Sequence, residues 1–453
     1  MKLTTMKNLI CILLVFSLGF VSCSKGSDDP VPQETPVKNE NFLVKTLLYT
    51  EWASASTVMS MDYADMRNSL ISGLDNRCDD ALSFLQEMDD VDLCLGAMVY
   101  KFFFEANIFS AQQLASMTLE EYRTSMIDLN AAKTVFSVSE LQKKNNIRNL
   151  SIAYGWWFYQ NTSTKQKIEK LNNVASAEPS FDMKDDKGRV MDVLRIVKAD
   201  ESYTYLGVYH AMANTNEFIL YLAGSNDLKN WTNISALGDR SHQGDIEKWG
   251  NGYIIANEQD PIQGSNNIRV RYYSSYADLI ENKPFSDKTI SQTFSNLAEG
   301  TPDIRKIEGS GPSSSHIVIG YHYYDNGVRD QQAFGILHDF SDWRTWKDEV
   351  SNFTIQEMGY KGNIGGRSAF SHDGDYVLQE AQVSSGDWSS WRLLFGNGAF
   401  YYTMQPQTPL GSTSFANPGI TSIDADKFVV TSFLPSQGNR SGEIGELLYI
   451  VQF

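Results

Sequence analysis

The chain has 453 residues, of which 42% are hydrophobic and 21% charged, the composition of a globular protein too long for one ordinary domain. Its 55 acidic and 38 basic residues give a formal net charge of −17. This balance argues against nucleic acid and anionic lipid as partners, because both carry negative charge themselves. It fits a neutral ligand or a soluble surface protein.

Residues 1–22 have the pattern of an export signal. Lys2 and Lys7 supply the positive end, and residues 9–20 form an apolar run that is too short to span a bilayer. The following Val-Ser-Cys at 21–23 resembles the lipobox of bacterial lipoproteins, in which the cysteine thiol is attached to diacylglycerol. The resemblance implies a membrane anchor at Cys23, and an ordinary secretory signal is the alternative.

Residues 23–41 predict a disordered tether, because they are rich in Pro, Asp, Glu and Ser and offer almost no apolar surface to bury. The acidic stretch just after Cys23 resembles the surface-export signal of Bacteroidetes lipoproteins. That resemblance implies a lipid-anchored protein of the outer membrane that faces the cell surface.

Residues 42–175 carry apolar side chains three and four positions apart, which predicts an α-helical domain. The expected helices cover residues 42–58, 63–74, 78–87, 91–108, 110–132 and 137–158. No catalytic constellation occurs among them, so we expect a spacer, a partner surface or a lid. Cys78 and Cys94 lie here, and both a disulfide and two buried thiols fit the sequence.

The composition changes after a polar segment at 172–187, which we interpret as a linker. Six of the nine tryptophans lie beyond it. Asn-Gly or Asp-Gly pairs at 251–252, 326–327, 373–374 and 397–398 predict tight hairpins between apolar strands. The C-terminal region therefore reads as all-β.

A short pattern returns five times in this region: a small or acidic lead-in, an apolar strand, a polar turn, and a strand rich in Tyr, Val and Ile. The equivalent apolar positions, about 50 to 66 residues apart, are Leu194, Ile246, Ile304, Phe370 and Ile420. That spacing is the size of one four-stranded propeller blade with its loops. The predicted fold is multidomain, with an N-terminal α-helical domain followed by an all-β five-bladed β-propeller at 181–453.

Residues 225–231, Ser-Asn-Asp-Leu-Lys-Asn-Trp, follow an apolar strand. They resemble an S-x-D-L-x-x-W element at the outer edge of blades in five-bladed glycosidases of glycoside hydrolase families 43, 32 and 130, and 275–279 and 340–346 are weaker copies. We expect a structural role for this element, because Ser and Asp can accept bonds from turn amides while Trp packs between strands. The resemblance covers residues 181–453 and implies a propeller glycosidase.

Enzymes of this fold carry three carboxylates on the axis, because the leaving oxygen must be protonated while the anomeric carbon is attacked. Carried over by position, the resemblance implies Asp192 as the base, Asp245 as the pKa modulator and Glu299 as the acid. Two departures from the family pattern are Thr301, which is inserted after the Glu-Gly at 299–300, and Val193, which follows Asp192 in place of proline. Strand starts, turns and surface loops are the structural alternatives for the three carboxylates.

Five further residues are predicted to contact substrate: a cation, two aromatic rings, a histidine and a fallback carboxylate, namely Arg367, Trp249, Tyr209, His242 and Asp303. A structural ion pair, blade-core packing and a satisfied strand histidine are the alternatives. The sequence predicts no metal site and no cofactor, with calcium on the propeller axis as the one ion that an axial histidine would help to bind.

The predicted function is that of a glycoside hydrolase acting on a poly- or oligosaccharide at the cell surface. The alternative is a surface glycan-binding lipoprotein that has lost the carboxylate triad. Three carboxylates converging within about 10 Å on the axis favour hydrolysis, and a funnel with one or none favours binding alone.

Overall fold

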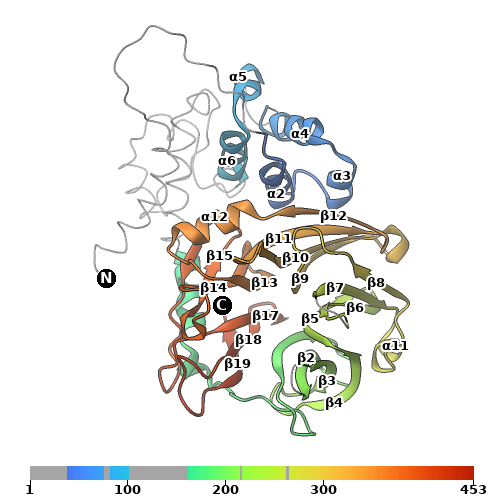
Figure 1. The fold of residues 1–453 in the computed structure, drawn as a ribbon, viewed down its shortest axis with the longest axis vertical. Helices are drawn as coiled ribbons and strands as arrows, with labels where there is room; N and C mark the ends of the chain where they lie inside the picture. The colour runs from blue at the N-terminus through green and yellow to red at the C-terminus, as the bar shows by residue number, and fades with distance from the viewer. Residues whose placement is uncertain (1–37, 76–81, 102–161, 215–216, 262–264) are drawn as a thin grey trace. The chain divides into compact units, whose positions relative to one another are not determined.

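The computed structural model describes residues 38–75, 82–101, 162–214, 217–261 and 265–453, in two compact units, Met1–Lys165 and Gln166–Phe453 (Figure 1). Helices occupy the first unit and a five-bladed β-propeller the second, so the predicted fold class is confirmed. Cys23, Cys78 and the predicted helices at 110–132 and 137–158 lie outside the described residues. None of the helices in these ranges is long and apolar enough to cross a bilayer.

The N-terminal unit contains five described helices: α2 (Glu40–Thr50), α3 (Ala55–Ser60), α4 (Tyr63–Asp75), α5 (Leu82–Glu87) and α6 (Asp90–Tyr100). The helix expected over 42–58 is broken, because Glu51 ends α2 in the left-handed conformation and Ser54 caps α3 by accepting the Thr57 amide. Cys94 is a free, buried thiol, and burial raises its pKa to about 12.

The propeller consists of five antiparallel sheets, each formed by strands consecutive in sequence. Blade 1 contains β1 (Asp192–Lys198), β2 (Tyr205–Asn214), β3 (Glu217–Ser225) and β4 (Thr232–Asp239), and blade 2 contains β5 (Ser241–Trp249), β6 (Gly252–Gln259), β7 (Asn267–Tyr273) and β8 (Ser286–Ile290). Blade 3 contains β9 (Glu299–Glu308), β10 (His316–Asp325), β11 (Arg329–His338) and β12 (Asp342–Lys347). Blade 4 contains β13 (Ile364–Ser371), β14 (Asp375–Gln382), β15 (Trp391–Gly396) and β16 (Tyr401–Thr403), and blade 5 contains β17 (Ala416–Asp424), β18 (Lys427–Leu434) and β19 (Gly445–Gln452). Connections carry α11 (Tyr276–Ile280), α12 (Glu349–Glu357), η4 (Pro312–Ser314) and η5 (Trp388–Ser390).

Neighbouring blades are held together by apolar side chains on both faces of each sheet. Successive residues of a strand point to opposite faces, so Ile255 packs with Val208 of blade 1 while Ile254 packs with Ile319 of blade 3. This explains the continuous apolar strands of the sequence. Truncating a fully buried residue such as Ile255 to alanine is expected to destabilise the fold by about 2–5 kcal/mol.

The inner strands close into a ring, since β1, β5, β9, β13 and β17 contact one another in that order and β17 contacts β1. The segment interpreted as a linker completes the closure. Ser180 exchanges two backbone hydrogen bonds of 2.8 Å with Leu448 of β19, and the Met183 amide donates to Glu446. Ahead of it, α10 (Thr162–Asn172) and η3 (Val174–Ala177) lead into the propeller, where the Tyr449 hydroxyl donates to Leu171 O at 2.9 Å. The linker interpretation of 172–187 is therefore wrong for these residues.

The element at 225–231 forms the turn after β3 that the sequence predicts. The Ser225 hydroxyl accepts the Leu228 amide at 2.9 Å, and the Asp227 carboxylate accepts the Lys229 and Asn230 amides at 2.9 and 2.8 Å. Trp231 is buried and donates its indole N–H to Leu228 O. These contacts confirm its structural role.

Candidate functional site

All five inner strands begin at the same end of the propeller, because each blade repeats one strand order. We call this end the mouth. Second strands end there and third strands begin there, so the mouth gathers strand starts and hairpin loops from every blade. The other end is called the opposite end.

Each inner strand carries a β-bulge just inside the mouth, shown by a shift in pairing register. Four bulges contain a residue with positive φ, namely Val193, Gln243, Thr301 and Asn417. Counted from the bulges, the apolar position equivalent to Ile246 is Ile196 in blade 1 and Ser368 in blade 4. The prediction that Leu194 and Phe370 are equivalent to Ile246 is therefore wrong.

Counting residues from the bulges also shows that Asp192 and Asp245 do not occupy equivalent positions in their blades. Asp192 pairs with His210 before its bulge, as His242 pairs with Glu258, whereas Asp245 lies after its bulge and corresponds to Arg195. Asp192 and Asp245 therefore occupy different levels along the axis.

Side chains from one blade clasp the bulge of the next blade. The left-handed bulge amides donate in four places: Gln243 N to His210 Nδ1 at 3.2 Å, Thr301 N to Glu258 Oε1 at 2.6 Å, Asn417 N to Glu380 Oε2 at 2.5 Å, and Val193 N to Glu446 Oε2 at 2.9 Å. Burial raises the pKa of Glu380 to about 7 and that of Glu446 well above its usual range, despite the amides that lower both. We call Glu258, Glu380 and Glu446 the clasp carboxylates.

Charged side chains fill the central channel below the bulges. The Arg195 guanidinium reaches across to the Arg367 carbonyl at 3.0 Å, and Asp303 Oδ2 lies 3.0 Å from Arg305 Nε and 3.8 Å from Arg367 Nε. The Asp245 carboxylate accepts the Ile304 amide at 2.7 Å. The structure thus brings together three predicted residues, Asp245, Asp303 and Arg367.

Two carboxyl groups of this channel network have raised pKa values. Burial raises the pKa of Asp245 to about 6, with Arg195 lowering and Asp303 raising it. Burial also raises the pKa of Glu247 to about 8, with further contributions from Asp245 and Asp303. Glu247 is nevertheless exposed to solvent. We infer that the side chain lines the central channel, where protein lies around it but leaves it in contact with water.

Asp192 and Asp330 are two carboxylates of the mouth that remain partly open to solvent. Both are half-buried, and neither accepts a hydrogen bond from the described residues. Burial raises the pKa of Asp192 to about 6, with a smaller contribution from Asp182. Burial also raises the pKa of Asp330, which starts the third strand of blade 3, while His322 lowers it and Glu258 raises it.

Glu299 lies at the mouth at the start of β9 and is 2% exposed. Its Oε1 accepts backbone amides from three residues, Thr293, Phe294 and Ser295, at 2.8, 2.5 and 3.0 Å. Burial raises its pKa and outweighs these amides and His322, which lower it. Its Oε2 accepts no hydrogen bond from the described residues, so the carboxyl is oriented by one oxygen only.

Two histidines of the mouth lie among carboxylates. His242 Nε2 is 3.0 Å from Asp260 and its Nδ1 is 3.5 Å from Glu258; burial lowers its pKa, but the two acids outweigh burial and the net shift is upward. His322 is half-buried, its Nδ1 has no partner within the described ranges, and its charge lowers the pKa of acids in blades 2, 3 and 4. His322 therefore lies between blades at the mouth.

Two predicted substrate contacts are not brought to the mouth. Tyr209 is fully buried and donates to Asp185 Oδ2 at 2.6 Å. Trp249 ends β5 at the opposite end, where its indole N–H donates to Gly309 O at 3.1 Å.

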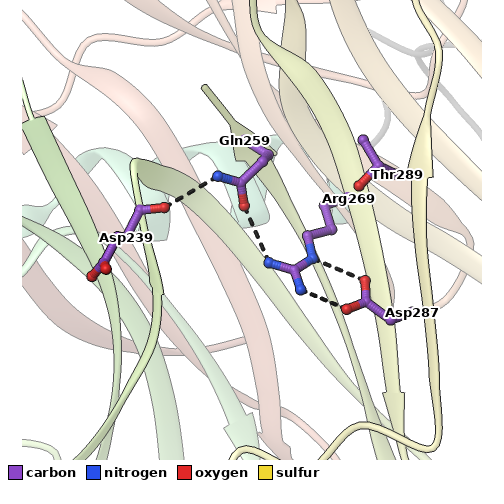
Figure 2. Close-up of a pocket in the computed structure, with 5 residues that line it drawn as sticks. All are labelled: Asp239, Gln259, Arg269, Asp287 and Thr289. Carbon is purple, nitrogen blue, oxygen red and sulfur yellow. Dashed lines mark hydrogen bonds and ion pairs between the residues drawn. The ribbon is translucent and has the colours of Figure 1, made fainter. Parts of the chain in front are cut away.

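A separate cavity of about 490 Å³ lies between blades 1 and 2, lined by Asp239, Gln259, Arg269, Asp287 and Thr289 (Figure 2). The Arg269 guanidinium binds the Asp287 carboxylate through two nitrogens and donates to Gln259 Oε1 at 3.2 Å. None of the predicted site residues lines it. Within the described part of the chain, no group of three His, Cys, Asp or Glu side chains could hold a metal ion.

No protein-family model matches the chain, and no curated protein matches it. Among solved structures it is similar to a thermostable family-43 glycoside hydrolase, with 12% identity and a TM-score of 0.38 over 57% of this chain and 88% of that one. It is also similar to the endo-arabinanase of glycoside hydrolase family 43 from Bacillus licheniformis, with 12% identity and a TM-score of 0.35 over 60% and 96% of the two chains. A third is an endo-arabinase from Bacteroides thetaiotaomicron, with 10% identity and a TM-score of 0.38 over 60% and 97%.

Proposed function

We propose that the chain is a glycoside hydrolase whose active site is the mouth of the propeller and whose substrate is a poly- or oligosaccharide. One observation carries the proposal: partly exposed carboxylates without hydrogen-bond partners gather at the mouth with raised pKa values. Leaving a half-buried carboxylate unpartnered is unfavourable, and such groups cluster at sites that perform acid–base chemistry.

Hydrolysis of a glycosidic bond needs an ionised base or nucleophile and a protonated acid. Asp192, with a pKa of about 6, is mostly ionised at pH 7 and serves as the base in this proposal. Glu299 serves as the acid, because its raised pKa favours the protonated form and its anchored Oε1 leaves Oε2 to carry the proton. Asp245 and the channel network below them set the local field, while Asp330 and His322 complete the acidic mouth.

The test is hydrolysis of a panel of arabinan, xylan, fructan and mannan by the purified chain. Glu299→Gln keeps the size of the side chain but removes the ionisable proton, so turnover should fall to background on a substrate that the wild type cleaves. Glu281→Gln is the matched control, because Glu281 is exposed at the opposite end and its one ion pair among the described residues is with Lys283. Unchanged turnover by Glu299→Gln would remove Glu299 from the mechanism, and binding without turnover by the wild type would favour the glycan-binding alternative.

We further propose that the protein is anchored by lipid at Cys23 on the cell surface, and that it needs no cofactor. The support is the resemblance of residues 21–23 and of the acidic tether to lipoprotein export signals. Metabolic labelling with a fatty acid should mark the wild type and not Cys23→Ser. Treating the purified protein with a chelator should leave turnover unchanged, and loss of activity restored by calcium would contradict the expectation.

A further inference from the structure

The exposed apolar side chains of the propeller are distributed unevenly between its two ends. Eight large hydrophobic side chains are exposed among the described residues. Seven lie on strand ends or connections at the mouth and come from all parts of the ring: Met212, Leu297, Val328, Val383, Trp388, Leu410 and Ile444. Phe285 alone lies at the opposite end. The mouth therefore has an apolar rim around a polar, acidic centre.

Four of the seven stand on a rigid platform formed by the connections of blades 4 and 5, and these are Val383, Trp388, Leu410 and Ile444. The Ser414 hydroxyl donates to Trp388 O at 2.6 Å, and Asn439 donates to Ser414 O at 2.8 Å. Glu443 accepts the Leu410 amide at 2.7 Å and the Thr408 hydroxyl at 2.6 Å. Because side chains tie these loops to one another, the exposed apolar groups are held in place before any ligand arrives.

Trp388 is the centre of this platform. It is 49% exposed, and its ring centroid lies 6.3 Å from that of the buried Trp391 at an interplanar angle of 60°, so Trp391 packs against the indole from the protein side. An exposed indole on a rigid support presents a flat apolar area, to which the C–H faces of a sugar ring are complementary.

The charge around the rim selects among sugars. Connections 291–298 and 404–415 contain no charged residue. Among the described residues of the mouth, Asp192 and Asp330 accept no hydrogen bond and the cations Arg240 and Arg440 have no acidic partner, while the whole chain carries a net charge of −17. The net negative charge of the chain would repel a uronic-acid polymer, whereas a neutral glycan meets apolar contacts and hydrogen-bonding groups without a charge penalty.

We propose that the mouth accepts a long, uncharged polysaccharide, and that this chain leaves the mouth across blades 4 and 5 with a sugar ring stacked on Trp388. The inference rests on the proposed function and specifies its substrate class. Short substrates that fill only the acidic centre would not reach the Trp388 platform.

Affinity electrophoresis of the purified chain in gels with arabinan, xylan, fructan or mannan tests this, with polygalacturonate as the charged comparison. The wild type should be retarded by a neutral polymer and not by polygalacturonate. Trp388→Ala should weaken retention by about tenfold, in line with the loss of one well-placed aromatic contact, and Trp388→Phe should restore part of it. Phe285→Ala is the matched control, because it removes an aromatic ring that is 71% exposed at the opposite end, and retention should not change.

A second readout separates this inference from the function it rests on. Hydrolysis of a small aryl glycoside should be unchanged in Trp388→Ala, because this substrate fills only the acidic centre of the mouth and does not reach the Trp388 platform. Equal polymer retention of Trp388→Ala and wild type would overturn the Trp388 subsite while leaving hydrolysis at the mouth intact. Equal retention by polygalacturonate would overturn the preference for neutral glycans, and failure of every glycan to bind or react would remove the proposed function itself.

Discussion

The mouth holds two kinds of buried carboxylate that look alike in the sequence. The clasp carboxylates Glu380 and Glu446 are buried and accept backbone amides of β-bulges, whereas Asp192 and Asp330 are half-buried and accept no hydrogen bond from the described residues. Burial raises the pKa in both groups, so the pKa alone does not distinguish them. The comparison teaches that an accessible carboxylate oxygen without a hydrogen bond, more than the pKa of the group, separates a chemical role from a structural one.

The largest effect is expected from Asp192→Asn, which tests whether Asp192 has a chemical role. The variant removes the base but keeps the shape of the side chain, so turnover should fall by about 10²–10⁴-fold. Stability above pH 6 should be unchanged or slightly higher, because the wild type holds an unpartnered charge there. Turnover assays and urea denaturation of the same preparation measure both; a stability loss with full activity would assign Asp192 to the structural group.

Glu380→Ala should give the reverse result. The Gly366 and Asn417 amides lose their acceptor in a buried position, which should lower the free energy of unfolding by about 2–5 kcal/mol. Urea denaturation measures the loss. A Glu380→Ala protein as stable as the wild type would show that the clasps contribute little to closure of the ring.

The smallest expected effect concerns pH. Carboxyl groups with raised folded-state pKa values, such as Glu247 at about 8, bind more protons in the folded chain than in the unfolded chain. Their contribution is complete below the usual carboxyl pKa near 4 and is lost as the pH rises toward 8. Thermal unfolding between pH 5 and 8 should therefore show Tm falling with pH, and Glu247→Gln should flatten the slope. A steeper slope in the variant would contradict this sign.

Much of the fold is predictable from the chain because the blades repeat. Ile246, Ile304 and Ile420 recur at one structural position, and the hairpin pairs and the turn at 225–231 mark the strand ends. Two features escaped this reasoning. In blade 1, Leu194 and Ile196 are both apolar and lie two positions apart on β1, so the pattern alone does not show which of them is equivalent to Ile246. The pairing of Ser180 with Leu448 joins the first and last parts of the propeller, and local composition does not report so distant a contact.

The candidate site is less predictable for the same reason. Asp192 and Glu299 begin inner strands, so the lead-in pattern points to them. Asp330 lies at the start of a third strand and His322 on a second strand, outside any lead-in, and only ring closure brings them to the mouth. Trp249 and Trp388 are both aromatic residues next to turns, and only the strand order shows that Trp388 lies at the mouth and Trp249 at the opposite end.

The most direct test of the central claim is the pH dependence of kcat/KM on the best polysaccharide of the panel. If the half-buried Asp192 acts as the base, the acid limb of the profile should bend at about pH 6 in the wild type, since kcat/KM reports the essential base of the free enzyme. An acid limb that bends near pH 4, where an ordinary exposed carboxylate titrates, would contradict the account.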